Sequence, residues 1–239
     1  MSDQEQRLRL LVEQFTREVM EVLSGLQTSS AEIVVTAPRP TKQEENKLNL
    51  KAFFDHIRKP LFNRLTAKQV SGHEDILKEL KRRNVPLSHA AYVLATAYHE
   101  TAKRMQPVRE GLNASDAWRK RNLRYYPWYG RGHVQLTWRE NYVRADRELS
   151  LGGALVANAD LALEPEVSVQ VLVVGSVEGW FSKDRQGNPH TLARHLPNGE
   201  RATRAQFNQA RRIINLMDRA DLIAGHALVY QEALQKAGY

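Results

Sequence analysis

"PLSHAAYVLATAYHETAKRM", residues 86–105, is the stretch that decides the fold class. Small and apolar side chains occupy nearly every position after Ser88, so the segment predicts a helix that is apolar on almost all sides. Such a helix is buried by other elements. Ser88 is the predicted N-cap, because a hydroxyl at this position can accept a hydrogen bond from the first turn.

Further helical patterns surround this segment from Leu48 onward and predict a mainly α architecture with at most a small sheet. They cover residues 48–58, 71–84, 137–149, 165–181, 204–218 and 219–238. Ser71 and Gly72 are read as the start of the second helix, and Thr137 as the cap of the third. Residues 165–181 alternate valines like a strand, but Pro165 at the start and the length of the run favour a helix.

The N-terminal part reads differently. Residues 6–26 predict an amphipathic helix, and residues 27–47, with Pro38 and Pro40, predict a linker. We therefore expect residues 1–47 to form a helix and linker before a domain at 48–239. We expect this helix to pack as an arm on that domain, on another copy of the chain or on another protein. A membrane anchor is not expected, because the polar face of the helix is not basic enough.

Composition excludes several classes. The chain has no Cys, which rules out disulfides and thiolate metal sites. It has no apolar run long enough for a transmembrane helix and no N-terminal secretion signal. The net charge is +8, and eleven Lys or Arg face four Asp or Glu between Lys103 and Arg147. This charge should attract a polyanion, whether nucleic acid, an acidic glycan or an anionic surface.

Glu100 and Glu110 are the candidate chemical groups. Glu100 falls at the end of the buried helix, where apolar surroundings and the helix dipole disfavour a carboxylate and favour a general acid. Glu110 follows Pro107 and Arg109 on a predicted loop, where it should be ionised. Two carboxyls in contrasting environments suit glycosidic bond cleavage. Spacing alone, however, equally fits counter-charges on a basic surface.

Residues 124–142, "RYYPWYGRGHVQLTWRENY", hold five Tyr or Trp residues before Asn141 and a Gly-Arg-Gly turn. Aromatic rings beside Arg, Gln and Asn suit sugar stacking, and glycines let a backbone approach a ligand. An aromatic turn packed on the core and a nucleic-acid platform remain alternatives. The turn lacks the Lys-Ser/Thr ending of a phosphate loop.

Taken in order, these segments resemble glycoside hydrolase family 19, the chitinase-like family, and within it the phage and prophage endolysin branch. The resemblance is carried by "AYHETA" (97–102), "REG" (109–111), "YYPWYGRGHVQLTWRENY" (125–142) and "RRIIN" (211–215), with "KAFFDHIRKPLF" (51–62) resembling the start of the domain. It implies a lysozyme-like, two-lobed helical domain with a central cleft.

The resemblance also implies roles for individual residues. Glu100 matches the general acid, Glu110 is the best match for the general base, and Thr137 matches the residue that holds the water. Substrate-binding positions are implied for His99, Tyr129, Arg131, Gln135, Asn141 and Asn215. The chain departs from the family after Asn215, where Leu-Met-Asp replaces Gly-Gly, and in the polar loop at 183–203.

The expected function is hydrolysis of β-1,4 bonds in peptidoglycan, with inversion, by an enzyme that needs no cofactor or metal. The basic face favours peptidoglycan over uncharged chitin, and the missing signal suggests accumulation in the cytoplasm before release to the cell wall. No nucleic-acid partner is expected. The alternatives are a chitinase, a lytic transglycosylase that uses one Glu, a non-catalytic structural protein of a virion or secretion apparatus, and a nucleic-acid binder.

Overall fold

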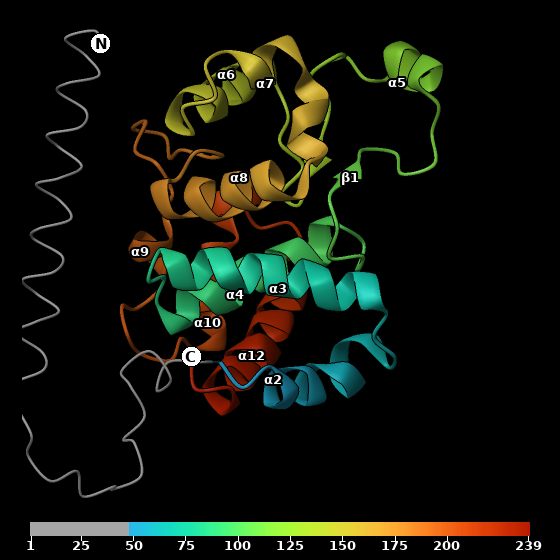
Figure 1. The fold of residues 1–239 in the computed structure, drawn as a ribbon. Coiled ribbons are helices and arrows are strands. Elements are labelled where there is room, and N and C mark those ends of the chain that lie inside the picture. Colours follow the sequence, from blue (N-terminus) through green and yellow to red (C-terminus); the bar gives the residue numbers. More distant parts are fainter. Residues whose placement is uncertain (1–47) are drawn as a thin grey trace, which may run out of the picture. The chain divides into compact units, whose positions relative to one another are not determined.

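Helix α4 (Leu87–Glu100) lies at the centre of a computed structural model that describes residues 48–239, all within one compact unit (Figure 1). Every side chain from Ser88 to Tyr98 is buried, so the predicted buried helix is confirmed. The predicted cap is wrong. The helix begins one residue before Ser88, and the Ser88 hydroxyl instead donates to the carbonyl of Pro197 at 2.8 Å.

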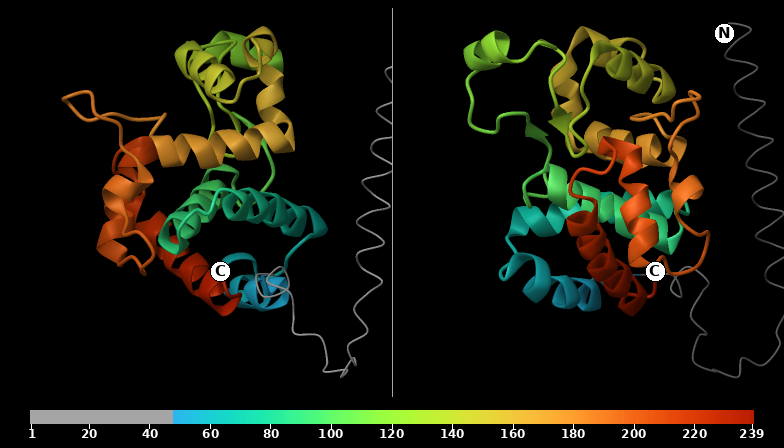
Figure 2. Two further views of the ribbon diagram at one scale, coloured as in Figure 1. Left: turned by 60° about the vertical axis from the view of Figure 1, so that its left-hand side comes forward. Right: turned by 180° about the vertical axis from the view of Figure 1, so that it is seen from behind.

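Helix α12 (Ala220–Lys236) packs along α4 and carries most of the contact with it. Helix α2 (Leu50–Ile57) and helix α10 (Arg204–Ala210) pack on α12 from other sides, as the two views of Figure 2 also show. Helix α2 continues into the π-helical turn η1 (Arg58–Phe62), which contains Pro60. These elements form one end of the core.

Helices α3 (Ala67–Arg82) and α8 (Pro165–Glu178) pack on each other and on α4. The helix prediction for 165–181 is confirmed: Pro165 occupies the first turn and Gly179 ends the helix in the left-handed conformation. The predicted start of α3 is wrong. A reciprocal cap between Thr66 and Gln69 starts the helix four residues before Ser71.

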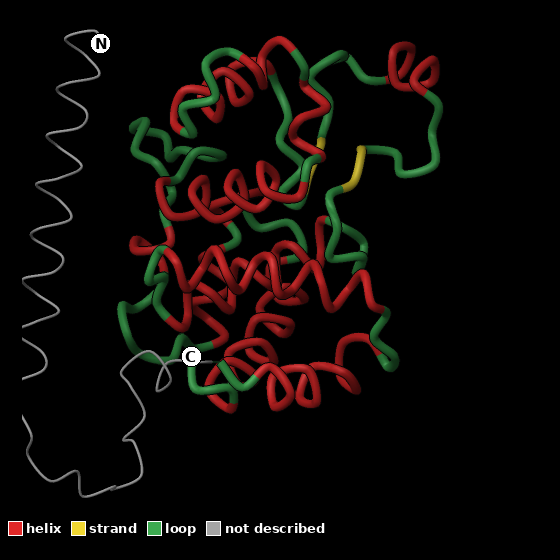
Figure 3. The backbone as a smooth tube through the Cα atoms, viewed as in Figure 1, coloured by secondary structure: helices red, strands yellow, loops and turns green. Residues whose placement is uncertain are grey.

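Shorter elements lie on the side of the domain away from α12 (Figures 1 and 3). These are α5 (Asp116–Asn122), α6 (Arg139–Glu148), α7 (Ala154–Ala157), the 3-10 helix η2 (Ala159–Leu163) and a two-stranded antiparallel sheet of β1 (Val108–Arg109) and β2 (Arg131–Gly132). The prediction that Thr137 caps α6 is wrong, because the Thr137 hydroxyl donates to the carbonyl of Gln135 at 2.7 Å.

The predicted helix at 204–218 is divided into α10 and α11 (Arg212–Asn215), while α9 (Leu192–His195) forms within the polar loop. The mainly α architecture with a small sheet is confirmed for residues 48–239. The helix and linker predicted at 1–47 lie outside the described residues. None of the helices within 48–239 combines the length and apolar character needed to cross a bilayer.

Candidate functional site

Glu100 is the last residue of α4 and forms an ion pair with Arg211. Arg211 donates from Nη1 to Oε1 of Glu100 at 2.9 Å and from Nε to the carbonyl of Asp218 at 2.8 Å. The Arg211 side chain is 1% exposed and that of Glu100 is 17% exposed. The expectation of apolar surroundings for Glu100 is therefore wrong at this contact: a buried cation fixes one oxygen of its carboxyl, and part of that carboxyl remains accessible.

His99 precedes this ion pair and is half-buried. Burial is the main cause that lowers its pKa; the charge of Arg211 adds to this effect, and the charge of Glu100 opposes it. The imidazole is consequently uncharged at neutral pH. This fits a residue that shapes the surroundings of Glu100 without adding a charge.

Glu110 lies directly after β1, and both of its carboxyl oxygens are held. Tyr125 donates its hydroxyl to Oε1 at 2.6 Å, and the backbone N–H of Gly130 donates to Oε2 at 2.9 Å. The Glu110 N–H in turn donates to the carbonyl of Gly130 at 2.7 Å. Burial, followed by the bond to Glu110, raises the pKa of Tyr125 to about 12, so the tyrosine stays a donor.

Gly130 has a steric reason to be glycine. A Cβ at this position would lie 2.9 Å from Oε1 of Gln135 and 3.3 Å from Oε2 of Glu110. The first distance is too short for real atoms, so any side chain would displace groups that surround the carboxyl. The Tyr-Gly-Arg-Gly motif thus meets Glu110 through its first glycine.

The connection between the two glutamates is anchored to α3. Gln69 donates from Nε2 to the carbonyl of Lys103 at 3.0 Å, and Gln106 donates from Nε2 to the carbonyl of Lys68 at 2.7 Å. Gly72 touches the same turn so closely that a Cβ would lie 1.6 Å from the carbonyl oxygen of Met105. These contacts fix the path of the chain from Glu100 to Glu110. Within residues 48–239, no hydrogen bond or ion pair joins the two carboxyls directly.

Gln135, Thr137 and Asn141 form a local network beside Gly130. Gln135 donates from Nε2 to the carbonyls of Val108 and Gly132 at 3.1 and 3.2 Å, and Asn141 donates from Nδ2 to the carbonyl of Thr137 at 2.8 Å. All three side chains are half-buried. The Thr137 hydroxyl uses its hydrogen on Gln135 and keeps lone pairs free to accept from a water.

Tyr129 and Arg131 are buried, at 1% and 5% exposure. The guanidinium of Arg131 stacks 3.6 Å from the centroid of the Tyr129 ring and donates from Nε to Asp160 at 2.8 Å. Arg109 also donates to Asp160 and to the Tyr129 hydroxyl. In this structure the side chains of Tyr129 and Arg131 support the loop from inside, and their role in substrate binding stays a prediction.

Asn215 ends α11 and is exposed. It lies four residues after Arg211, and Leu216 and Met217 beside it are also exposed. Asn215 is therefore linked to Glu100 only through the backbone that leads to Arg211. Among the described residues, no hydrogen bond joins the side chains of Asn215 and Glu100.

Sequence reasoning did not assign roles to Arg211, Tyr125 and Asp160. Arg211 stood inside the quoted "RRIIN" segment, and its partner could have been sought among buried carboxylates. From the sequence, Tyr125 is only one of the aromatic rings of residues 124–142, and its hydroxyl has no predicted partner. Asp160 lies far from every motif, and nothing in the sequence connects it to Arg109 and Arg131.

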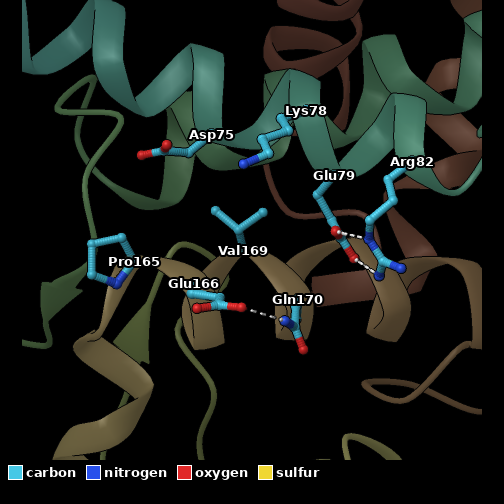
Figure 4. Close-up of a pocket in the computed structure, with 8 residues that line it drawn as sticks. All are labelled: Asp75, Lys78, Glu79, Arg82, Pro165, Glu166, Val169 and Gln170. Atoms are coloured by element: carbon cyan, nitrogen blue, oxygen red, sulfur yellow. Dashed lines mark hydrogen bonds and ion pairs between the residues drawn. The ribbon is translucent and has the colours of Figure 1, made fainter. Parts of the chain in front are cut away.

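A cavity of about 610 Å³ lies elsewhere, between α3 and α8 (Figure 4). Two of its charged lining residues pair with each other: Glu79 accepts hydrogen bonds from Arg82 at 2.7 and 2.8 Å. None of the predicted site residues lines it. Among residues 48–239, no group of three or more His, Asp or Glu side chains is arranged to hold a metal ion.

The chain was compared with protein-family models, with curated proteins and with solved structures, and none of the three comparisons found a match.

Proposed function

We propose that this protein is a glycoside hydrolase that cleaves β-1,4 bonds of peptidoglycan, with Glu100 as general acid and Glu110 as general base. The observation that carries the proposal is the contact between Glu110 and Gly130. Two motifs that are separated in the sequence, Arg-Glu-Gly and Tyr-Gly-Arg-Gly, meet there around one carboxyl. Both motifs are among the segments that carry the resemblance to family 19.

The surroundings of Glu110 suit a base. Two donors, the Tyr125 hydroxyl and the Gly130 N–H, orient the carboxylate, which must be ionised and fixed to take a proton from water. Thr137 is available to accept a hydrogen bond from that water. Glu100 would protonate the glycosidic oxygen from the opposite side, with Arg211 fixing its orientation. In this proposal the domain is lysozyme-like and two-lobed, and the substrate lies in a cleft between the glutamates.

An inverting mechanism needs room for a water between base and sugar, which corresponds to carboxyls roughly 6.5–9.5 Å apart. Separate anchoring of Glu100 by Arg211 and of Glu110 by Gly130 is compatible with such a spacing, since neither carboxyl uses the other as a partner.

The test is product analysis with the purified full chain on isolated peptidoglycan and, in parallel, on chitin. The expected result is release of muropeptides with new reducing ends in the α-configuration, and faster clearing of peptidoglycan than of chitin. Faster clearing of chitin would identify a chitinase. Anhydro sugar ends would contradict the two-carboxyl mechanism and identify a lytic transglycosylase. No release from either polymer would favour the structural-protein alternative.

A further inference from the structure

A second cavity, of about 520 Å³, lies beside α9 and α11 and has a strongly basic lining. Four cations line it, Lys183, Arg185, Arg194 and Arg212, against a single carboxylate, that of Asp184. With uncharged histidines, the lining carries a formal charge of 4 − 1 = +3. We refer to this cavity as the basic pocket.

The carboxylate of Asp184 is used within the protein. Its Oδ1 accepts from the N–H groups of Gln186 and Asn188 at 3.0 and 2.9 Å, and its Oδ2 accepts from Arg194 at 2.8 Å. Although desolvation acts to raise the pKa of Asp184, these hydrogen bonds lower it to about 2. Asp184 thus organises the turn at 184–188 and compensates Arg194 only.

Three positive charges remain without a carboxylate. Lys183 and Arg185 are exposed, and neither side chain has a hydrogen bond or ion pair with any of residues 48–239. Arg212 donates only to the neutral side chain of Gln209, at 3.0 Å. The turn organised by Asp184 fixes the backbone that carries the first two cations. An anion in the pocket would therefore meet charges that the protein leaves uncompensated.

Two histidines form one wall of the basic pocket. Nδ1 of His190 lies 2.9 Å from Nε2 of His195, so one ring donates to the other, and their rings stack 5.1 Å apart. Burial, together with the charges of Arg194 and Arg212, lowers the pKa of both histidines, and the pKa of His195, which His190 also lowers, falls to about 4. The histidines are therefore uncharged at neutral pH and can offer an N–H without adding a charge to the lining.

We propose that the basic pocket binds an oxyanion, a carboxylate or phosphate group, carried by the cell-wall polymer outside the sugar bond that is cleaved. The biological source of the oxyanion rests on the proposed function. Arg211, which holds Glu100, lies between α10 and α11, and Arg212, which lines the basic pocket, is the next residue and the first of α11. A polymer that reaches Glu100 would pass close to these cations.

The shared chemistry has two sources in walls, the carboxylates of peptide stems and the phosphates of wall-linked polymers. The test measures binding to the full chain by calorimetry at low ionic strength with three probes: triglutamate, triglutamine and inorganic phosphate. The variant Lys183→Gln/Arg185→Gln removes two exposed charges of the basic pocket. The matched control, Lys59→Gln/Arg64→Gln, removes two exposed charges in and beside η1.

Wild type and control should bind triglutamate or phosphate, and the variant should bind at least about fivefold more weakly, since each exposed ion pair contributes modestly. Preference for triglutamate assigns the pocket to peptide carboxylates, and preference for phosphate assigns it to phosphate polymers. Equal binding by variant and control, no binding of either anion, or equal affinity for triglutamine would overturn the proposal.

Hydrolysis is measured separately on the same proteins with soluble uncharged amino-sugar oligomers. The variant should keep the wild-type kcat, because neither Lys183 nor Arg185 belongs to the candidate catalytic site. Anion binding without hydrolysis by the wild type would contradict the proposed function alone. Hydrolysis without anion binding would contradict the basic pocket alone.

Discussion

Arg211, almost completely buried, donates from Nη1 to Oε1 of Glu100 at 2.9 Å and thereby joins the junction of α10 and α11 to the end of α4. This relationship makes Glu100 part of the structure as well as the proposed acid. Loss of the carboxyl would leave a buried guanidinium without its counter-charge, which is costly because a buried charge must be paired. Stability and catalysis are therefore separable by the choice of substitution.

The first prediction compares Glu100→Gln with Glu100→Ala. Glu100→Gln removes the charge but keeps an oxygen that can accept from Arg211. Its free energy of unfolding should therefore lie within about 1.5 kcal/mol of the wild-type value. Glu100→Ala leaves Arg211 unpaired and should cost about 3 kcal/mol. Urea unfolding measures both values. Equal losses for the two variants would show that the ion pair contributes nothing specific.

The second prediction concerns the donor to Glu110. Tyr125→Phe removes the 2.6 Å hydrogen bond to Oε1 and should lower kcat on peptidoglycan by about tenfold, because the base loses one of its two orienting donors. The matched control is Tyr126→Phe, whose hydroxyl donates to Asp116 at 2.9 Å. The control should keep wild-type activity. Similar kcat values for both variants would remove the role assigned to Glu110.

The third prediction concerns the turn between the glutamates. Gly72→Ala would place a Cβ 1.6 Å from the carbonyl oxygen of Met105, a contact that backbone must move to relieve. We expect a loss of about 3 kcal/mol or more in unfolding free energy. Gly225→Ala in α12 is the control, since its Cβ would come no closer than 3.7 Å to Arg204 and alanine favours a helix. If both variants match wild type in thermal melts, the close approach of α3 to this turn is wrong.

The fourth prediction concerns acid. Burial lowers the pKa of His73 and of His133 to about 4, from an ordinary value of 6.5. The unfolded chain therefore binds these protons first, so the stability they contribute is complete above about pH 6.5 and is lost as the pH falls toward 4. Between pH 7 and 5.5 we expect a loss of about 1 kcal/mol for each histidine.

His73→Phe tests this sign. The His73 ring lies among the rings of Phe53, Phe54 and Phe62, so phenylalanine keeps the ring packing and removes the titrating group. It also removes the hydrogen bonds to the Gln69 carbonyl and the Tyr230 hydroxyl, a loss that is the same at both pH values. Urea unfolding at pH 7 and 5.5 should show a smaller loss on acidification in His73→Phe than in wild type. An unchanged difference between the two pH values would show that His73 does not take part.

The local sequence pattern predicts much of the fold, and the predictions that fail do so for local reasons. The all-round apolar character of α4 predicts its burial, and Pro165 predicts the start of α8. The predicted end at 181 is too late, because the chain turns left-handed at Gly179. The cap predictions at Ser88 and Thr137 failed because their hydroxyls bond to Pro197 and Gln135, partners that helix signals do not reveal.

The candidate site follows from sequence only in part. Its glutamates stand in quoted motifs, but tertiary packing sets their partners, and Arg211, which holds Glu100, lies 111 positions away in the sequence. Asp160, which accepts from Arg131 of the Tyr-Gly-Arg-Gly motif, lies outside every motif. The burial of Tyr129 and Arg131 could not be read from the motif either, because a loop with glycines and aromatics suits both a ligand surface and a packed support.

The central claim, that Glu100 protonates the glycosidic bond, is tested most directly by one comparison. Purified wild type and Glu100→Gln are incubated with isolated peptidoglycan, and soluble products are identified by mass spectrometry. The account predicts muropeptides with new reducing ends from wild type and a loss of at least about a hundredfold in their rate of release for Glu100→Gln. Equal release of these products by the folded variant would contradict it.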